Sequence, residues 1–177
     1  MNKAWLHFKT ITYHKYLVMQ GCFKVGLYKQ GLLHDLSKYT PSEFIVGAKY
    51  YQGNRSPNNA EREDIGYSSA WLHHKGRNKH HYEYWIDYSE AVEDGLVPVP
   101  IPDRYLVEMF MDRVAASKVY NGKNYTDKSP LEYYELGKGI RMLHKKSKKK
   151  LEFLLHMLAE KGEDYTFRYI RKRILVK

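Results

Sequence analysis

The stretch of the chain that decides the fold class is AWLHFKTITYHKYLVMQGCFK, residues 4–24. Its bulky apolar side chains follow a three-to-four-residue period: Trp5, Phe8, Ile11, Leu17 and Val18. That period is typical of an amphipathic α-helix. His7 and His14 are seven residues apart, so the same helix presents both on one face.

Most of the remaining chain also reads as helix, separated by loops rich in Gly, Pro and Asn. We expect further helices over residues 26–38, 40–51, 60–74, 82–95, 103–120, 130–144, 147–161 and 165–174. The stretch LVPVPIPD, residues 96–103, is expected to be an extended connector, because its three prolines stand at alternate positions. No segment is rich in strand signals. The sequence therefore predicts an all-α fold, a bundle of about seven or eight helices.

Two of these helices carry capping signals at their starts. Each combines a hydroxyl side chain, a proline and a glutamate: Thr40, Pro41 and Glu43 in the first, and Ser129, Pro130 and Glu132 in the second. Both glutamates are expected to complete capping boxes.

Length and composition point to one domain spanning residues 1–177. At 43% hydrophobic residues the chain can form a core, so it is not expected to be disordered. The single cysteine, Cys22, excludes an internal disulfide and a cysteine-based zinc site. The N-terminal stretch lacks the apolar core of a signal peptide, and no run of about 18 apolar residues suggests a membrane span. We expect a cytoplasmic protein without a membrane partner.

The formal net charge of +10 is concentrated at the C-terminal end. Residues 138–177 hold 13 Lys and Arg against 4 Asp and Glu, a net charge of +9, whereas residues 1–137 carry +1. The chain thus predicts a basic helical extension from about residue 130. Its HKKSKKK stretch, residues 144–150, could bind nucleic acid or an acidic partner. The leucines that follow, residues 151–158, favour an ordinary packed helix with a solvated basic face.

The stretch with the clearest chemistry is LLHDLSK, residues 32–38, which contains the pair His34 and Asp35. Imidazole and carboxylate are ligands that suit first-row divalent metals. Adjacent residues on a helix point about 100° apart. The pair could therefore reach one ion only near a helix end, or could bind two neighbouring ions.

Further candidate ligands lie elsewhere in the chain: His14, His73 or His74, His80 or His81, and Asp112. Asp112 stands among apolar residues in VEMFMDRVAASK, where a carboxylate is costly unless it is paired or metal-bound. If these side chains converge, the chain is a metal-dependent enzyme.

A histidine on an early helix, a His-Asp pair and a distant aspartate together resemble the HD-domain metal-dependent phosphohydrolases. LLHDLSK resembles the HD-x-G/S-K turn of that superfamily, WLHHKGRNKHH its additional histidine region, and YLVEMFMDRVAASK its late aspartate helix. The run HDLSKYTPSEF…HHKGRNKHHYEYW is most similar to a small bacterial and phage-type group of about this length. The resemblance covers roughly residues 10–120 and implies an HD-domain-like helical bundle.

The resemblance also implies roles for individual residues. The core ligand set would be His14, His34, Asp35 and Asp112. A second ion would be bound by His74 and by one of His80 and His81. Lys38 would contact a substrate phosphate and act in catalysis beside Asp35. Arg77, Arg113 and Lys118 are weaker candidates for phosphate contacts. Where common two-metal members have a glutamate and a Gly-Tyr-Pro element, this chain has Lys75 and RNKHHYEYW, so cyclic-dinucleotide specificity is not implied.

Several of these residues also fit ordinary structural roles. His34 and Asp35 could bond the backbone at a helix end, and Lys38 could be a helix-end cation favoured by the dipole. Asp112 could pair with Arg104 or Arg113. His7, His144 and His156 are not expected to be ligands.

We expect a metal-dependent phosphohydrolase that uses one or two divalent ions, Mn, Fe, Co, Ni or Zn, to activate water against a nucleotide or another phosphate ester. Two alternatives remain open at this point. One is a di-iron HD-type oxygenase, which would use the same ligands. The other is a non-catalytic module that binds nucleic acid or another partner through the basic C-terminal helices.

Overall fold

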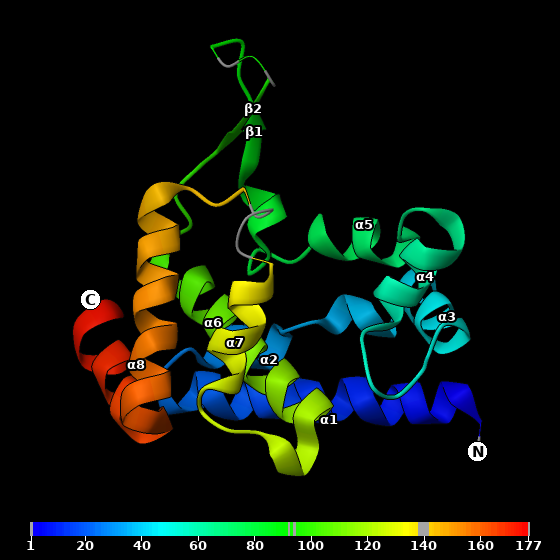
Figure 1. The fold of residues 1–177 in the computed structure, drawn as a ribbon, viewed down its shortest axis with the longest axis horizontal. Coiled ribbons are helices and arrows are strands. Elements are labelled where there is room, and N and C mark those ends of the chain that lie inside the picture. Colours follow the sequence, from blue (N-terminus) through cyan, green and yellow to red (C-terminus); the bar gives the residue numbers. More distant parts are fainter. Residues whose placement is uncertain (1, 92, 94, 138–141, 177) are drawn as a thin grey trace.

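The structure is a computed structural model that describes residues 2–91, 93, 95–137 and 142–176. Its α-helices are α1 (Lys3–Lys24), α2 (Tyr28–Leu33), α3 (Pro41–Lys49), α4 (Pro57–Ile65), α5 (Ser69–Lys75), α6 (Asp103–Asn121), α7 (Ser129–Leu136) and α8 (Lys145–Tyr169). Short 3-10 turns are η1 (Leu36–Tyr39), η2 (Tyr82–Trp85) and η3 (Gly122–Asn124), and η5 (Ile170–Ile174) is π-helical. Eight α-helices in the described part of the chain confirm the predicted all-α fold (Figure 1).

The core forms where α1, α6, α7 and α8 pack together. Its most deeply buried side chains come from these four helices and from η5, and include Val18, Cys22, Leu106, Phe110, Tyr134, Leu151, Leu154, Leu158 and Ile170. The leucines of α8 recur at three and four residues and therefore form one buried stripe. The basic C-terminal segment thus contributes its apolar face to the same core as α1 and α6.

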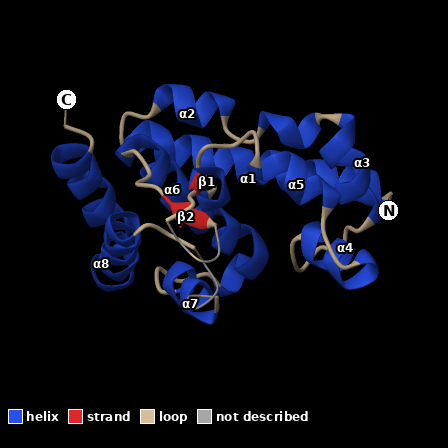
Figure 2. Ribbon diagram, turned by 90° about the horizontal axis from the view of Figure 1, so that it is seen from above, coloured by secondary structure: helices blue, strands red, loops and turns tan. Residues whose placement is uncertain are grey.

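A second group of helices, α3, α4 and α5, packs over the first half of α1. In Figures 1 and 2 this group lies toward the N-terminal end of α1, with α8 at the opposite end. The segment from His34 to Thr40 connects α2 to α3 between the two groups. This arrangement places the His-Asp pair at the junction of the two helical groups.

The helix expected over residues 82–95 does not form in the described part of that segment, which leaves out residues 92 and 94. The segment forms η2 and then a small antiparallel hairpin of β1 (Ile86–Tyr88) and β2 (Leu96–Pro98), with Ile86 opposite Pro98. The prolines keep the second strand extended, as predicted for the connector, and the first strand pairs with it. Figure 1 shows the hairpin projecting from the helical body.

Three other helix boundaries also differ from the prediction. The helix expected over 26–38 ends at Leu33, because Asp35 takes a left-handed backbone conformation with φ 54°. The helix expected over 60–74 is split into α4 and α5 at Gly66, which has φ 83°. The helix expected over 130–144 ends at Leu136; residues 142–144 are not helical, and 138–141 lie outside the described residues.

The last two expected helices, 147–161 and 165–174, form one run in α8 and η5. A local kink marks the expected break at Gly162, where φ is 77°. Neither predicted capping box forms. Thr40 Oγ1 donates to the Ser37 carbonyl (2.6 Å) and does not cap α3. Ser129 is the first residue of α7 and not the residue before it. Its Oγ accepts from the Thr126 N–H (3.1 Å) and does not cap the helix.

Within the described part of the chain, no helix has both the length and the apolar character that crossing a membrane requires.

Candidate metal centre

The His-Asp turn directs two adjacent side chains toward one point. His34 has extended backbone angles (φ −51°, ψ 127°), and Asp35 is left-handed, so neither residue belongs to a helix. Lys15 of α1 holds the turn by donating to the carbonyls of Leu32 (2.6 Å) and His34 (2.8 Å). Both His34 and Asp35 are 1% exposed. The 100° separation of neighbouring helical side chains therefore does not apply here.

One oxygen of Asp35 belongs to a cluster with α1 and α6. Asp35 Oδ2 lies 3.3 Å from His34 Nε2 and 3.7 Å from His14 Nε2. Asp112 Oδ1 completes the cluster at 2.9 Å from His14 Nε2 and 3.6 Å from His34 Nε2. We call these four residues, His14, His34, Asp35 and Asp112, cluster A.

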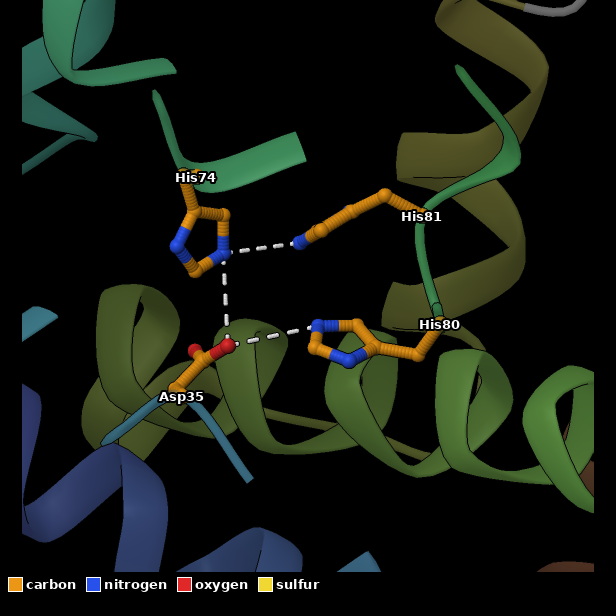
Figure 3. Close-up of side chains that lie close together, drawn as sticks. All are labelled: Asp35, His74, His80 and His81. Atoms are coloured by element: carbon orange, nitrogen blue, oxygen red, sulfur yellow. Dashed lines mark hydrogen bonds and ion pairs between the residues drawn. The ribbon is translucent and has the colours of Figure 1, made fainter. Parts of the chain in front are cut away.

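The other oxygen of Asp35 belongs to a cluster with α5 and the residues before η2. Asp35 Oδ1 lies 3.2 Å from His74 Nε2 and 3.3 Å from His80 Nε2. His81 Nε2 lies 2.9 Å from His74 Nε2 (Figure 3). We call Asp35, His74, His80 and His81 cluster B. The structure thus brings both histidines of the 80–81 pair to the site.

Both clusters fit a metal ion. Ligand atoms about 2.0–2.2 Å from one ion lie about 3.0–3.5 Å from each other, which matches the separations above. Four buried atoms among these ligands have close polar neighbours but make no hydrogen bond of good geometry: His14 Nε2, His34 Nε2, Asp35 Oδ1 and His80 Nε2. Buried polar atoms are normally bonded, so imidazole and carboxylate atoms that converge without well-formed hydrogen bonds suit a cation, which displaces any proton that they carry. The structure therefore contains buried His/Asp clusters that could hold a metal ion.

Two glutamates behind the imidazoles complete the site. Glu108 Oε1 lies 3.0 Å from His34 Nδ1 and 3.2 Å from His80 Nδ1, so it binds one ring from each cluster. Glu43 Oε2 lies 2.7 Å from His74 Nδ1. A carboxylate that accepts the Nδ1 proton leaves the Nε2 lone pair free for a metal.

Sequence reasoning missed both of these glutamates. The spacing of Glu43 predicts a capping box, but its carboxylate lies against α5. His73 is the partner of its other oxygen, at 2.7 Å, and so faces Glu43 and not Asp35. A signal for Glu108 was present, because it stands four residues before Asp112 in an apolar stretch and shares its helical face.

Ionised carboxylates dominate the electrostatics of the site. Burial raises the pKa of Asp35, but the positive charges of His34 and Lys38 outweigh it and hold that pKa well below its usual range. Burial likewise lowers the pKa of His34, yet the carboxylates around it raise that pKa well above 6.5. Burial and the neighbouring imidazoles of His80 and His74 lower the pKa of His81. The anionic centre favours binding of cations.

A cleft of about 770 Å³ opens onto the clusters, within the size range of small-molecule sites. Lys38 lines it, with Nζ 2.5 Å from Asp35 Oδ2. Arg113 also lines it and lies over the Tyr134 ring, 5.6 Å from the centroid.

The other predicted site residues lie apart from the clusters. Arg77 is exposed and donates to the His73 carbonyl at 3.2 Å. Lys118 forms an ion pair with Glu163 and lines a separate small hollow. His144 and His156 lie outside both clusters: His144 Nδ1 accepts from the Lys146 N–H at the start of α8, and His156 is exposed.

The comparison with curated proteins found no match, and neither did the comparison with solved structures. One protein family matches, described as "Family of unknown function (DUF5662)", and the match covers residues 3–157. That range includes every residue of clusters A and B. The chain belongs to the DUF5662 family.

Proposed function

We propose that this protein is a metal-dependent phosphohydrolase of the HD type, with two divalent ions that share Asp35. The observation that carries the proposal is that the two oxygens of the Asp35 carboxylate face different clusters. Its Oδ2 faces cluster A and its Oδ1 faces cluster B, and each cluster adds three further ligands. A shared carboxylate is a natural bridge for a two-metal site, in which ions lie about 3.5–4 Å apart.

The donor set suits first-row divalent metals such as Mn, Fe, Co, Ni or Zn. His14, His34, Asp35 and Asp112 would hold one ion, and Asp35, His74, His80 and His81 the other. When bound, such ions lower the pKa of a water ligand and neutralise charge on phosphoryl oxygens.

The chain's own residues supply orientation and charge. Glu108 and Glu43 fix the rings of His34, His80 and His74 through their Nδ1 atoms. Lys38 stays protonated, because the carboxylates of Asp35 and Asp112 raise its pKa even though burial lowers it. Its ammonium borders the cleft, where it would bind a phosphoryl oxygen and stabilise the charge that develops there.

The test is elemental analysis of protein purified without added metal, followed by hydrolysis assays. We expect close to two first-row metal atoms per chain, and metal-dependent hydrolysis of p-nitrophenyl phosphate or bis(p-nitrophenyl) phosphate. Chelation should abolish turnover and the metal should restore it. A protein free of metal after incubation with each candidate ion would refute the proposal.

Assays with and without dioxygen separate the hydrolase from the oxygenase that the same ligands could support. Hydrolysis that continues without dioxygen supports the proposal. Iron as the sole bound metal, dioxygen consumption and no phosphate release would favour the oxygenase.

A further inference from the structure

His7 is a buried polar side chain that lines the cleft and belongs to neither cluster A nor cluster B. It lies on α1, is 6% exposed and lines the cleft. Its ring packs on Phe44 (centroids 5.4 Å apart) and on Tyr51 (5.9 Å). Its Nδ1 is buried without a hydrogen-bond partner. Unpartnered buried polar atoms are uncommon and call for an explanation.

The packing indicates which ring nitrogen carries the proton. A buried N–H without an acceptor is rarer in proteins than a buried acceptor without a donor. His7 therefore keeps its proton on Nε2, the edge that lies against α3. It is neutral at pH 7, since burial and the charge of Lys38 lower its pKa to about 4. His7 thus offers one N–H donor.

Gly47 lets the His7 ring pack closely against α3. A Cβ atom at position 47 would lie 2.3 Å from His7 Nε2, far inside van der Waals contact. Gly47 also lines the cleft, so no side chain from this position covers the Nε2 edge of the imidazole.

Tyr51, whose ring packs against that of His7, offers an acceptor. Thr10 Oγ1 donates to the Leu6 carbonyl at 3.0 Å, so it must accept from Tyr51 Oη, which is also 3.0 Å away. With its proton used in this way, the Tyr51 oxygen keeps lone pairs for another donor. Tyr51, like His7, lines the cleft.

The spacing along α1 sets the distance between this pair and cluster A. His7 and His14 are seven residues apart, which is about 10.5 Å along one face of a helix. The positive charge of Lys38 reaches both imidazoles, since after burial it is the next cause that lowers the pKa of His7 and of His14. A ligand whose phosphate lies beside His14 would need an organic group about as long as a nucleoside to reach His7.

From these observations we propose that His7 and Tyr51 form a recognition subsite for the organic part of the substrate. The subsite would bind an uncharged group that carries an acceptor and a donor side by side, as an amide-type edge of a heterocycle does. It would select phosphate esters whose polar ring lies about 10 Å from phosphorus. This inference rests on the proposed hydrolase function and adds the class of ester.

Three phosphate esters test the subsite. p-Nitrophenyl phosphate is too short to reach it, 1-naphthyl phosphate lacks the polar edge, and inosine 5′-monophosphate carries an amide edge at nucleoside distance. His7→Leu should lower kcat/KM for inosine 5′-monophosphate about 10- to 100-fold, as expected for one lost hydrogen bond in a buried site. Turnover of the two other esters should change less than about twofold, because their binding does not use that bond.

Further variants provide controls. Tyr51→Phe should lower kcat/KM for the same nucleotide by several-fold, and it carries the test if His7→Leu does not fold. His7→Gln keeps an N–H donor and should restore part of the loss. Ile45→Ala, at an exposed position on α3, should have no effect. Equal losses on all three esters, or no loss on the nucleotide, would overturn the subsite.

A binding measurement separates this inference from the proposed function. If neither these esters nor bis(p-nitrophenyl) phosphate is hydrolysed, the hydrolase proposal fails, and calorimetric titration with inosine 5′-monophosphate then judges the subsite alone. Binding that His7→Leu weakens at least about tenfold would support it. Wild-type protein that does not bind the nucleotide, or a variant that binds it equally well, would refute it.

Discussion

Replacing Glu108 by alanine should weaken metal binding at both clusters at once. Its Oε1 atom accepts from His34 Nδ1 at 3.0 Å and from His80 Nδ1 at 3.2 Å. His34 belongs to cluster A and His80 to cluster B. Losing a carboxylate behind a ligand histidine typically costs about 10- to 100-fold in metal affinity. We therefore expect a loss of about 1.4–2.7 kcal/mol in binding free energy for each ion.

Glu43 provides the matched comparison. Its carboxylate binds His74 Nδ1 at 2.7 Å and, through its other oxygen, His73, which is not part of either cluster. Glu43→Ala should therefore lower the affinity of cluster B by a similar factor and leave cluster A unchanged. Glu108→Gln keeps an acceptor oxygen and should lie between the parent and Glu108→Ala.

Competition of the metal-free protein with a chromogenic zinc chelator, fitted to two sites, measures these affinities. Glu132→Gln, at an exposed position on the rim of the cleft, serves as a control and should bind like the parent. Circular dichroism shows whether each variant keeps its helices. Two unchanged affinities in Glu108→Ala, or a loss confined to one site, would refute the assignment of Glu108 to both clusters.

Three further predictions concern the same site. His34→Ala or Asp35→Ala should remove bound metal and hydrolytic activity while the helix content survives; full metal occupancy in both variants, by elemental analysis, would refute the ligand assignment. Lys38→Ala should leave the metal content intact and lower turnover of a phosphate ester, because an ammonium donates to phosphoryl oxygens but does not ligate a cation; turnover equal to the parent would reduce Lys38 to a helix-end cation. Metal binding should release protons at pH 7, because the pKa of His34 is raised above 6.5 in the metal-free protein, where the surrounding carboxylates outweigh burial. The same raised pKa stabilises the metal-free protein: the contribution is fully present below the unfolded-state pKa of 6.5 and is lost as the pH rises through the higher pKa of the folded state. Calorimetry in two buffers of different ionisation enthalpy would detect the protons, and identical heats would contradict the assignment.

The long helices could be predicted because their apolar residues repeat with a clear period. α1 and α6 begin and end within about two residues of the expected bounds. The structure of the segment from Tyr82 to Tyr88 could not be predicted, since its aromatic and β-branched residues fit a strand as well as a helix. Only its partner strand, held extended by prolines, decides between the two.

The candidate ligands that the structure brings together were accessible to sequence reasoning, because a carboxylate among apolar residues is costly unless it is paired or metal-bound. The carboxylates that bind the Nδ1 atoms of these histidines were not accessible in this way. Glu43 has the spacing of a capping box, and a sequence does not show that its carboxylate meets two histidines 30 and 31 residues later. The left-handed backbone at Asp35 was also hidden, although it explains how neighbouring residues serve one site.

The candidate ligands come from four separate parts of the chain: α1, the turn after α2, the stretch from α5 to η2, and α6. Bound ions would therefore act as a cross-link between the two helical groups, which otherwise meet along α1. Because the unfolded chain cannot assemble such a site, the binding free energy would add to the free energy of unfolding. A chelator would then lower the free energy of unfolding of the whole molecule as well as abolish its activity. The abundance of the folded protein would depend on the concentration of available metal.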